Sequence, residues 1–298
     1  MTKFKYPNAP LTPELLASLG DAETIIFGKL NYPLVNGNLK LPNTIKRVEF
    51  KEGVFYDGLP MSITEFDADD EVDASRLWVG IEKCEVTSLN NIEFLPISVT
   101  TLTLMILNEP IYNWTPNLRE LNINYLECNL DFPTTLERLY VGYSNEDFDK
   151  ILNSPENLKE FVLETQNIFC DEIKINFNKK LESFEFHGCV NGQDITHHNK
   201  FEELTSCKNF MIESTEINSL CYPKEVETLT IKLYQGELSE IDEEYLDGIE
   251  DFDFTPYQHL ISMDDEELYR KVVYLMRAWN GDNTLPSTLR ELEIIYKN

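Results

Sequence analysis

Histidine and cysteine side chains gather in one stretch of the sequence. His187, Cys189, His197, His198 and Cys207 fall within 21 residues, and imidazole and thiolate groups are common zinc ligands. A structural zinc site also places its ligands in closely spaced pairs, and this stretch lacks that spacing. We expect no bound metal, and we interpret Cys189 and Cys207 as packed thiols.

Carboxylates alternate along residues 67–73 (DADDEVD), which resemble the start of a calcium-binding loop. Such a loop has Gly at its sixth position and a bidentate Glu at its twelfth. Here the twelfth position is Trp78, and no Gly stands at the sixth. We therefore interpret these acids as solvated surface.

Sequence motifs of the common enzyme classes are absent. The chain contains no GxxxxGK(S/T), GxGxxG, GxSxG or HExxH pattern, and its four histidines limit acid–base chemistry. Because 53 residues are acidic, neighbouring carboxylates carry no information about paired-acid catalysis. We predict a non-enzymatic protein that needs no cofactor.

The net charge of −28 narrows the classes of partner. Nucleic acids and anionic membranes are bound through clustered Lys and Arg, so we expect neither as a partner. Eight acids and no base lie between Lys51 and Arg76, and thirteen acids and no base lie between Lys232 and Arg270. These blocks indicate either a solubilising surface or attraction for a basic partner.

The sequence also bears on compartment. It has no run of about 18 apolar residues and no apolar segment near Met1 of the kind that forms a secretory signal. The six cysteines are scattered without a CxxC pair, which is typical of reduced thiols. We expect a monomer in the cytoplasm or nucleus.

One ten-residue pattern recurs along the chain. Its clearest copies are 41–50 (LPNTIKRVEF), 95–104 (LPISVTTLTL), 132–141 (FPTTLERLYV) and 285–294 (LPSTLRELEI). With the first residue as position 0, Pro stands at 1, Ser or Thr at 3, and apolar residues at 4, 7 and 9. Other copies with Pro begin at 59, 154 and 222, a shortened copy begins at 115, and weaker copies end at 186, 212 and 254. Such repetition is typical of a solenoid of stacked coils.

Positions 7 and 9 are apolar with a variable residue between them, which is the alternation of a β-strand. Proline at position 1 cannot donate to a strand ladder and belongs just outside the strand. The pattern therefore predicts about eleven short strands in one parallel sheet, with positions 4, 7 and 9 buried against neighbouring coils. The residues at position 7 are Val48, Phe66, Leu102, Leu121, Leu139, Phe161, Phe184, Phe210, Leu229, Phe252 and Leu292.

The pattern resembles the leucine-rich repeat (LRR), whose core is LxxLxLxxNxL, and in particular its FNIP-type variant. Val99, Leu102 and Leu104 match the first three leucines, and residues 107–111 (LNEPI) are similar to the FNIP signature. The resemblance covers residues 41–298 and implies an α/β solenoid with a curved parallel sheet, an irregular convex side and terminal helices. The family's Asn, which falls at position 12, is missing from the matched copies.

The two ends of the chain predict helices. Residues 1–40 are expected to cap the solenoid, with a short helix that has Thr12 as N-cap, Pro13 in its first turn and Gly20 at its end. The segment 262–280 predicts an inserted helix with one apolar face, formed by Leu268, Val272, Leu275, Met276 and Trp279. We interpret this helix as packed on the core, and the alternative is a helix that binds a partner.

Positions 6, 8 and 10 point to the other, concave face of the sheet. In the recognised copies this face holds twelve acids and four bases, together with a few apolar side chains. Apolar anchors surrounded by charge are typical of protein-binding patches, although an acidic chain shows acidic surface everywhere. The predicted partner-binding residues are Arg138, Tyr140, Glu160, Val162, Glu164, Glu185, His187, Met211 and Glu213.

We predict a non-enzymatic protein–protein interaction module that binds a basic partner on this face. The alternative is a substrate-recognition subunit of a ubiquitin ligase, a role that the repeat resemblance implies. Residues 10–16 (PLTPELL) are similar to the start of an F-box. A third possibility, repeats joined to a catalytic domain, is disfavoured because the chain ends on the repeat at 285–294.

Overall fold

The computed structural model describes residues 2–34, 36, 38–54, 56–128, 130–143, 150–165, 173–176, 180–188, 206–214, 223, 225–234, 249–251, 253–261, 266–279 and 287–297. The contacts between residues divide the chain into two compact units, 1–136 and 137–298.

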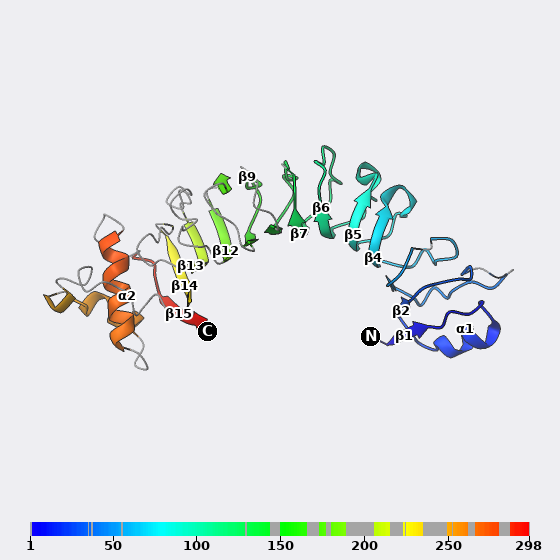
Figure 1. Ribbon diagram of the computed structural model, residues 1–298, viewed down its shortest axis with the longest axis horizontal. Coiled ribbons are helices and arrows are strands. Elements are labelled where there is room, and N and C mark those ends of the chain that lie inside the picture. The colour runs from blue at the N-terminus through cyan, green and yellow to red at the C-terminus, as the bar shows by residue number, and fades with distance from the viewer. Residues whose placement is uncertain are drawn as a thin grey trace. The chain divides into compact units, whose positions relative to one another are not determined.

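The first unit is a stack of coils, and each coil adds one strand to a parallel sheet (Figure 1). Its strands are β1 (Lys3–Tyr6), β2 (Thr24–Phe27), β3 (Arg47–Phe50), β4 (Glu65–Asp73), β5 (Lys83–Asn90), β6 (Thr101–Leu107) and β7 (Glu120–Leu126). Neighbouring strands pair in chain order. Helix α1 (Pro13–Leu19) begins after Thr12, whose hydroxyl oxygen accepts a hydrogen bond from the Leu15 N–H, and ends before Gly20. The sequence predicts this helix correctly.

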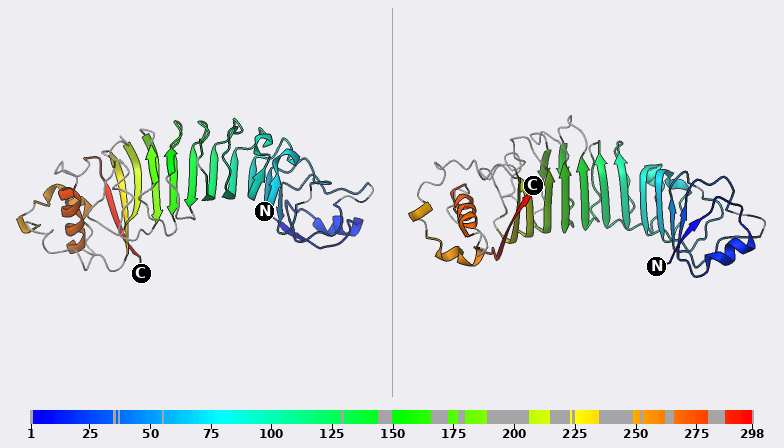
Figure 2. Two further views of the ribbon diagram at one scale, coloured as in Figure 1. Left: turned by 45° about the horizontal axis from the view of Figure 1, so that its top comes forward. Right: turned by 60° about the horizontal axis from the view of Figure 1, so that its bottom comes forward.

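The second unit repeats this architecture, and its strands lie side by side in both views of Figure 2. Its main sheet contains β8 (Arg138–Tyr143), β10 (Glu160–Thr165), β12 (Lys180–Gly188), β13 (Ser206–Ser214), β14 (Val226–Tyr234) and β15 (Glu291–Lys297), all parallel. Two short strands, β9 (Lys150–Asn153) and β11 (Ile173–Asn176), form a separate parallel pair. Helix α2 spans Glu266–Trp279.

A turn that contains proline opens most coils. The carbonyl of the residue at position 1 accepts a hydrogen bond from the N–H at position 4, as between Pro96 and Val99 at 3.0 Å. The hydroxyl at position 3 then joins neighbouring coils, because it donates to the position-4 carbonyl of the preceding coil. Ser62, Ser98, Thr135 and Thr288 make this bond to Ile45, Ile81, Leu118 and Val226 at 2.9, 2.7, 2.7 and 2.9 Å.

Positions 4, 7 and 9 form the core, as the pattern predicts. Val99, Leu102 and Leu104 of one coil are fully buried. In the second unit Phe161, Phe184 and Phe210 form a row along the sheet, in which the first pair is edge-to-face and the second is stacked, with ring centroids 5.5 and 5.4 Å apart. Aromatic pairs at this spacing add about 0.5–1.5 kcal/mol beyond the burial of their area.

The strands of two coils continue through position 12. Leu107 on β6 and Leu126 on β7 are in register there, and both are buried. The N–H of Glu127 donates to the carbonyl of Leu107 at 2.8 Å. Backbone groups at this position are thus satisfied by the strand ladder, without a side-chain amide.

The main sheets contain thirteen strands in the described residues, seven in the first unit and six in the second, where about eleven are expected. The pattern misses β1, β2 and β5, whose coils lack its proline. Two of them, β1 and β2, lie within residues 1–40, the expected cap. The expected strand ending at Phe254 is wrong, because residues 249–251 and 255–260 form 3-10 helices. The carboxylate of Asp253 accepts from the Thr255 N–H at 3.0 Å, a local bond that favours a turn over a strand.

Helix α2 ends at Trp279, before Gly281, as its sequence predicts. Its Val272 and Val273 are buried, which agrees with a helix packed on the core. The predicted start at 262–265 and the side chains of Leu268, Leu275, Met276 and Trp279 lie outside the described residues. Among the described helices, none is long and apolar enough to span a membrane.

Two neighbours on β6 test the register. Leu102→Ala removes a fully buried side chain and should lower the free energy of unfolding by about 2–5 kcal/mol. Thr101→Ala, on the opposite face, should lower it by less than about 0.5 kcal/mol. The two losses are measured by chemical denaturation. Equal losses would mean that the register is displaced by one residue, because such a slip exchanges the two faces.

Ser98 tests the hydroxyl link between coils. Its hydroxyl accepts from the Gly80 N–H at 3.0 Å and donates to the Ile81 carbonyl at 2.7 Å. Ser98→Ala should therefore cost about 1–3 kcal/mol in a urea melt. The matched control is Ser18→Ala, which removes an exposed hydroxyl on α1 and should cost less than about 0.5 kcal/mol. A similar small cost at Ser98 would show that water replaces the link.

Candidate functional site

The cluster of His and Cys residues does not form a metal site in the described part of the chain. His187 lies on β12 and Cys207 on β13, while Cys189, His197 and His198 lie outside the described residues. Within the described residues, no group of three or more His, Cys, Asp and Glu side chains is placed to hold a metal ion. Cys207 at position 4 and Cys84 at position 7 are buried core residues. Burial raises the pKa of each thiol to about 12, so both stay protonated at neutral pH.

The acids of residues 67–73 lie along strand β4 and have separate partners. Asp69 pairs with Lys51 at 3.2 Å, and Asp73 accepts from the Ser75 N–H at 3.0 Å. Because the strand is extended, its carboxylates do not converge on one point as a calcium loop requires.

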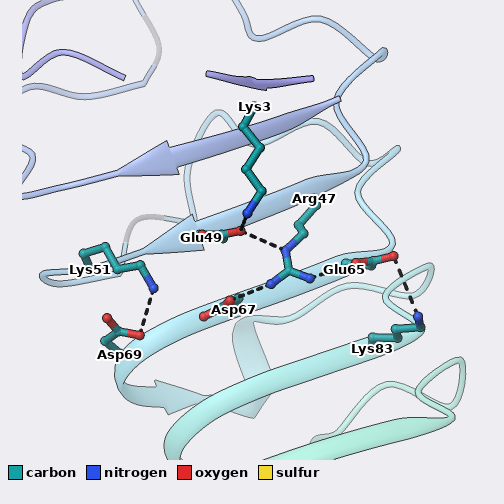
Figure 3. Close-up of polar contacts among 8 residues, drawn as sticks. All are labelled: Lys3, Arg47, Glu49, Lys51, Glu65, Asp67, Asp69 and Lys83. Carbon is teal, nitrogen blue, oxygen red and sulfur yellow. Dashed lines mark hydrogen bonds and ion pairs between the residues drawn. The ribbon is translucent and has the colours of Figure 1, made fainter. Parts of the chain in front are cut away.

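Positions 6, 8 and 10 of the strands form what we call the open face of each unit. In the first unit, Arg47 is the centre of an ion-pair network on this face (Figure 3). Its three guanidinium nitrogens contact three carboxylates: Nε lies 3.1 Å from Glu49, Nη1 3.2 Å from Glu65 and Nη2 2.8 Å from Asp67. One cation thereby joins β3 to β4.

The strands that the pattern misses supply further cations to this network. Lys3 on β1 lies 3.3 Å from Glu49, and Lys83 on β5 lies 4.0 Å from Glu65. Over all open positions of β1–β7 there are six acids and five bases, so this face is close to neutral. The acids are Glu49, Glu65, Asp67, Asp69, Glu85 and Glu120, and the bases are Lys3, Lys5, Arg47, Lys51 and Lys83.

In this network, desolvation and ion pairing act in opposite directions on the pKa of both Arg47 and Asp67. Partial burial acts to lower the pKa of Arg47, but the carboxylates of Glu49, Asp67 and Glu65 outweigh it, and the pKa is raised. Burial raises the pKa of Asp67, against the opposite effect of Lys51 and Arg47. The buried carboxylate of Glu49 depends most on its cations, because an unpaired charge there would be costly.

Arg47→Met tests this dependence. It leaves Glu49 buried with one cation fewer, and we expect the free energy of unfolding to fall by about 1–3 kcal/mol. That is below the roughly 3–5 kcal/mol of a fully buried pair because the Arg47 side chain is 30% exposed. Denaturant unfolding at neutral pH measures the loss. Lys51→Met, which breaks a largely exposed pair, is the control and should cost less than about 1 kcal/mol. Equal losses would contradict a special role for Arg47.

In the second unit the structure places all nine predicted binding residues at open positions of four adjacent strands. Arg138 and Tyr140 on β8 are in register with Glu160 and Val162 on β10. The remaining members follow on β10, β12 and β13, namely Glu164, Glu185, His187, Met211 and Glu213. The strand alternation read from the sequence is sufficient to bring them together.

Within the described residues, acids of this second face contact an arginine, a tyrosine and a histidine. Arg138 lies 3.2 Å from Glu160, Tyr140 donates to Glu164 at 2.5 Å, and His187 lies 3.2 Å from Glu185 and 3.7 Å from Glu213. With histidine counted as neutral, the open positions of the six strands hold six acids and two bases. The acids are Glu160, Glu164, Glu185, Glu213, Glu291 and Glu293, and the bases are Arg138 and Lys232.

Two of the predicted residues, Met211 and Glu213, are buried instead of exposed. Both lie on the inner strand β13, where Met211 has Glu185 and Thr230 as register neighbours and Glu213 has Lys232. Strands β12 and β14 lie on either side of them. Their open-face position follows from the sequence, but their exposure depends on these neighbours.

Beside Met211 the open face contains a hollow of about 280 Å³. It forms over β14, where the short side chains of Thr228 and Thr230 lie between longer ones on β13 and β15. Its lining residues are Ser183, Phe184, Glu185, Asn209, Phe210, Met211, Thr228, Thr230, Lys232, Glu293 and Ile295. The sequence pattern does not predict this hollow. The signal that could have indicated it is a pair of short side chains, Thr228 and Thr230, at positions 6 and 8 of one copy.

Comparisons with known proteins add no assignment. No protein-family model matches the chain, and no curated protein matches its sequence. What the protein does must therefore be argued from its repeats and its two open faces.

Proposed function

We propose that the protein is a non-enzymatic interaction module that binds a basic protein on the open face of the second unit. The observation that carries this proposal is the difference between the two faces. The face of β8–β15 has six acids and two bases, whereas the face of β1–β7 has six acids and five bases. Neighbouring strands lie about 4.8 Å apart, within one Debye length of about 8 Å, so the potentials of these carboxylates add.

The hollow also supports the open face of the second unit as the binding surface. Its lining contains Met211 together with the acids Glu185 and Glu293 and the base Lys232. A lysine or arginine side chain has an apolar stem and a cationic end, which suits a site that combines a methionine with two carboxylates. An anchor in such a hollow slows dissociation, while the acidic face accelerates association.

We also propose that the coils are degenerate leucine-rich repeats of the FNIP type. The support is the Pro-x-Ser/Thr turn, the buried positions 4, 7 and 9, and the parallel strand in each coil. Two of the coils differ from that family at position 12, where the strand ladder and buried leucines on β6 and β7 stand in place of its Asn.

The alternative, a substrate-recognition subunit of a ubiquitin ligase, would use the same surface. In the described part of residues 1–40 the chain forms strands β1 and β2 and the seven-residue helix α1. No observation in that segment favours an F-box, so this alternative rests on the repeat resemblance alone.

The test combines affinity capture with two charge-matched variants. The first variant reverses Glu160, Glu164 and Glu185 to Lys on the open face. The second reverses Glu225, Glu250 and Asp251 to Lys, three exposed acids away from the open positions. Quantitative mass spectrometry compares the proteins that each variant and the unmodified protein retain, and association rates are then measured with the purified partner.

We expect a basic partner that the unmodified protein and the second variant retain and the first variant loses. Its association with the first variant should be at least about 10-fold slower and should depend less on salt. Equal loss with both variants would show that only bulk charge matters. Ligase subunits among the retained proteins would favour the alternative.

A further inference from the structure

A row of apolar side chains is exposed on three consecutive coils of the first unit, away from its open face. Met61, Val79 and Ile97 occupy position 2, in the turns before β4, β5 and β6, and they are 68, 69 and 55% exposed. Phe94, just before the third turn, is 60% exposed. Position 2 of the other described copies holds Asn43, Pro116, Thr134, Glu156 and Ser287. The apolar row is thus confined to adjacent coils and is not a property of the repeat.

The three turns that carry the row contact one another. A Cβ added to Gly80 would lie 3.7 Å from the carbonyl oxygen of Met61, and the Gly80 N–H donates to the hydroxyl of Ser98 at 3.0 Å. Three coils about 4.8 Å apart give a row about 10 Å long.

The turns are also held in place. The N–H groups of Ile63 and Val99 donate to the carbonyls of Pro60 and Pro96 at 3.2 and 3.0 Å. An apolar row on such fixed turns binds a partner without a large cost in backbone ordering.

Charges beside the row indicate what could cover it. Asp57, Glu82 and Glu93 lie three or four residues from its members, and all three are exposed. Within the described residues, Glu82 and Glu93 form no ion pair. Of the two bases within four residues of the row, Lys83 lies at an open position of β5, whereas Arg76 lies 3.9 Å from Asp57 and over the ring of Tyr56 at 4.1 Å. Outside the open face, three acids and one base therefore make the surroundings of the row negative.

The charge of the whole chain decides between possible occupants. A second copy of the chain also has a net charge of −28 and would be repelled by this acidic surface. An anionic membrane would be repelled for the same reason. A segment with apolar side chains on one face and Lys or Arg on the other would bury the row and neutralise its surroundings. Two helical turns span about 11 Å, which matches the length of the row.

We infer that Met61, Val79 and Ile97 form a second docking site, which takes a basic amphipathic helix of a partner protein. The site lies on the turns of the first unit, so it is independent of the open face of the second unit. Apolar contact along the row supplies the dry interface, and Asp57, Glu82 and Glu93 select for cationic residues around it.

The probe is a synthetic amphipathic peptide of leucine and lysine, and its affinity is measured by fluorescence anisotropy. The test variant replaces Met61, Val79 and Ile97 with Ser. The control variant replaces Tyr32, Met105 and Tyr112 with Ser, three other exposed apolar residues of the same unit. Neither variant changes the net charge, so nonspecific attraction is the same in both. Because every replaced side chain is exposed, both variants should unfold at the same denaturant concentration as the unmodified protein.

We expect the test variant to bind the peptide at least 10-fold more weakly and the control variant to bind it unchanged. A peptide of leucine and glutamate should not bind. Equal binding by the two variants would overturn the proposal, because bulk charge would then explain the affinity. A dimer of the unmodified protein that the test variant loses in sedimentation would overturn it in favour of a second copy. Since the open-face variants keep this row, a failure here leaves the proposed function of the second unit untouched.

Discussion

Each coil of this protein satisfies its backbone hydrogen bonds through the coils beside it. A parallel strand has no partner within its own coil, and unpaired backbone groups in a buried position are costly. The carbonyl at position 5 accepts from two N–H groups of the next coil, as the Glu82 carbonyl does from Thr100 and Thr101. Turn, strand and core are therefore held in one register, and everything that the surfaces display follows from it.

That register explains why the short pattern has so few required residues. Proline closes the turn, the hydroxyl at position 3 links it to the preceding coil, and three apolar side chains fill the space between neighbours. Other residues can replace them when they meet the same physical need. Cys84 fills position 7 of β5 as a buried thiol, and that coil keeps its place in the sheet without a proline.

The same geometry gives the two open faces different electrostatic properties. In the first unit Arg47 meets three carboxylates at once, so the charges of Glu49, Glu65 and Asp67 are paired within the protein. In the second unit Glu164 and Glu185 meet a hydroxyl and an imidazole. A face whose charges are already paired has little left to offer a charged partner. The acidic face of the second unit and the apolar row of the first differ in chemistry because they use different positions of one repeat.

The sequence by itself determined the repeat, ten of the thirteen main strands, the buried positions 4, 7 and 9, and both described α-helices. These features depend on local rules, namely alternation, helix capping and the restrictions of proline. It also placed the nine predicted binding residues at open positions, because the alternation of side chains along a strand does not depend on the neighbouring strands. Only the tertiary structure decided which charges meet. Arg47 pairs with residues 2, 18 and 20 positions away, and Lys3 with one 46 positions away. Exposure was decided in the same way. Met105 and Met211 hold open positions of similar strands, yet the first is exposed and the second is buried, because side chains on adjoining strands set how much water reaches each one.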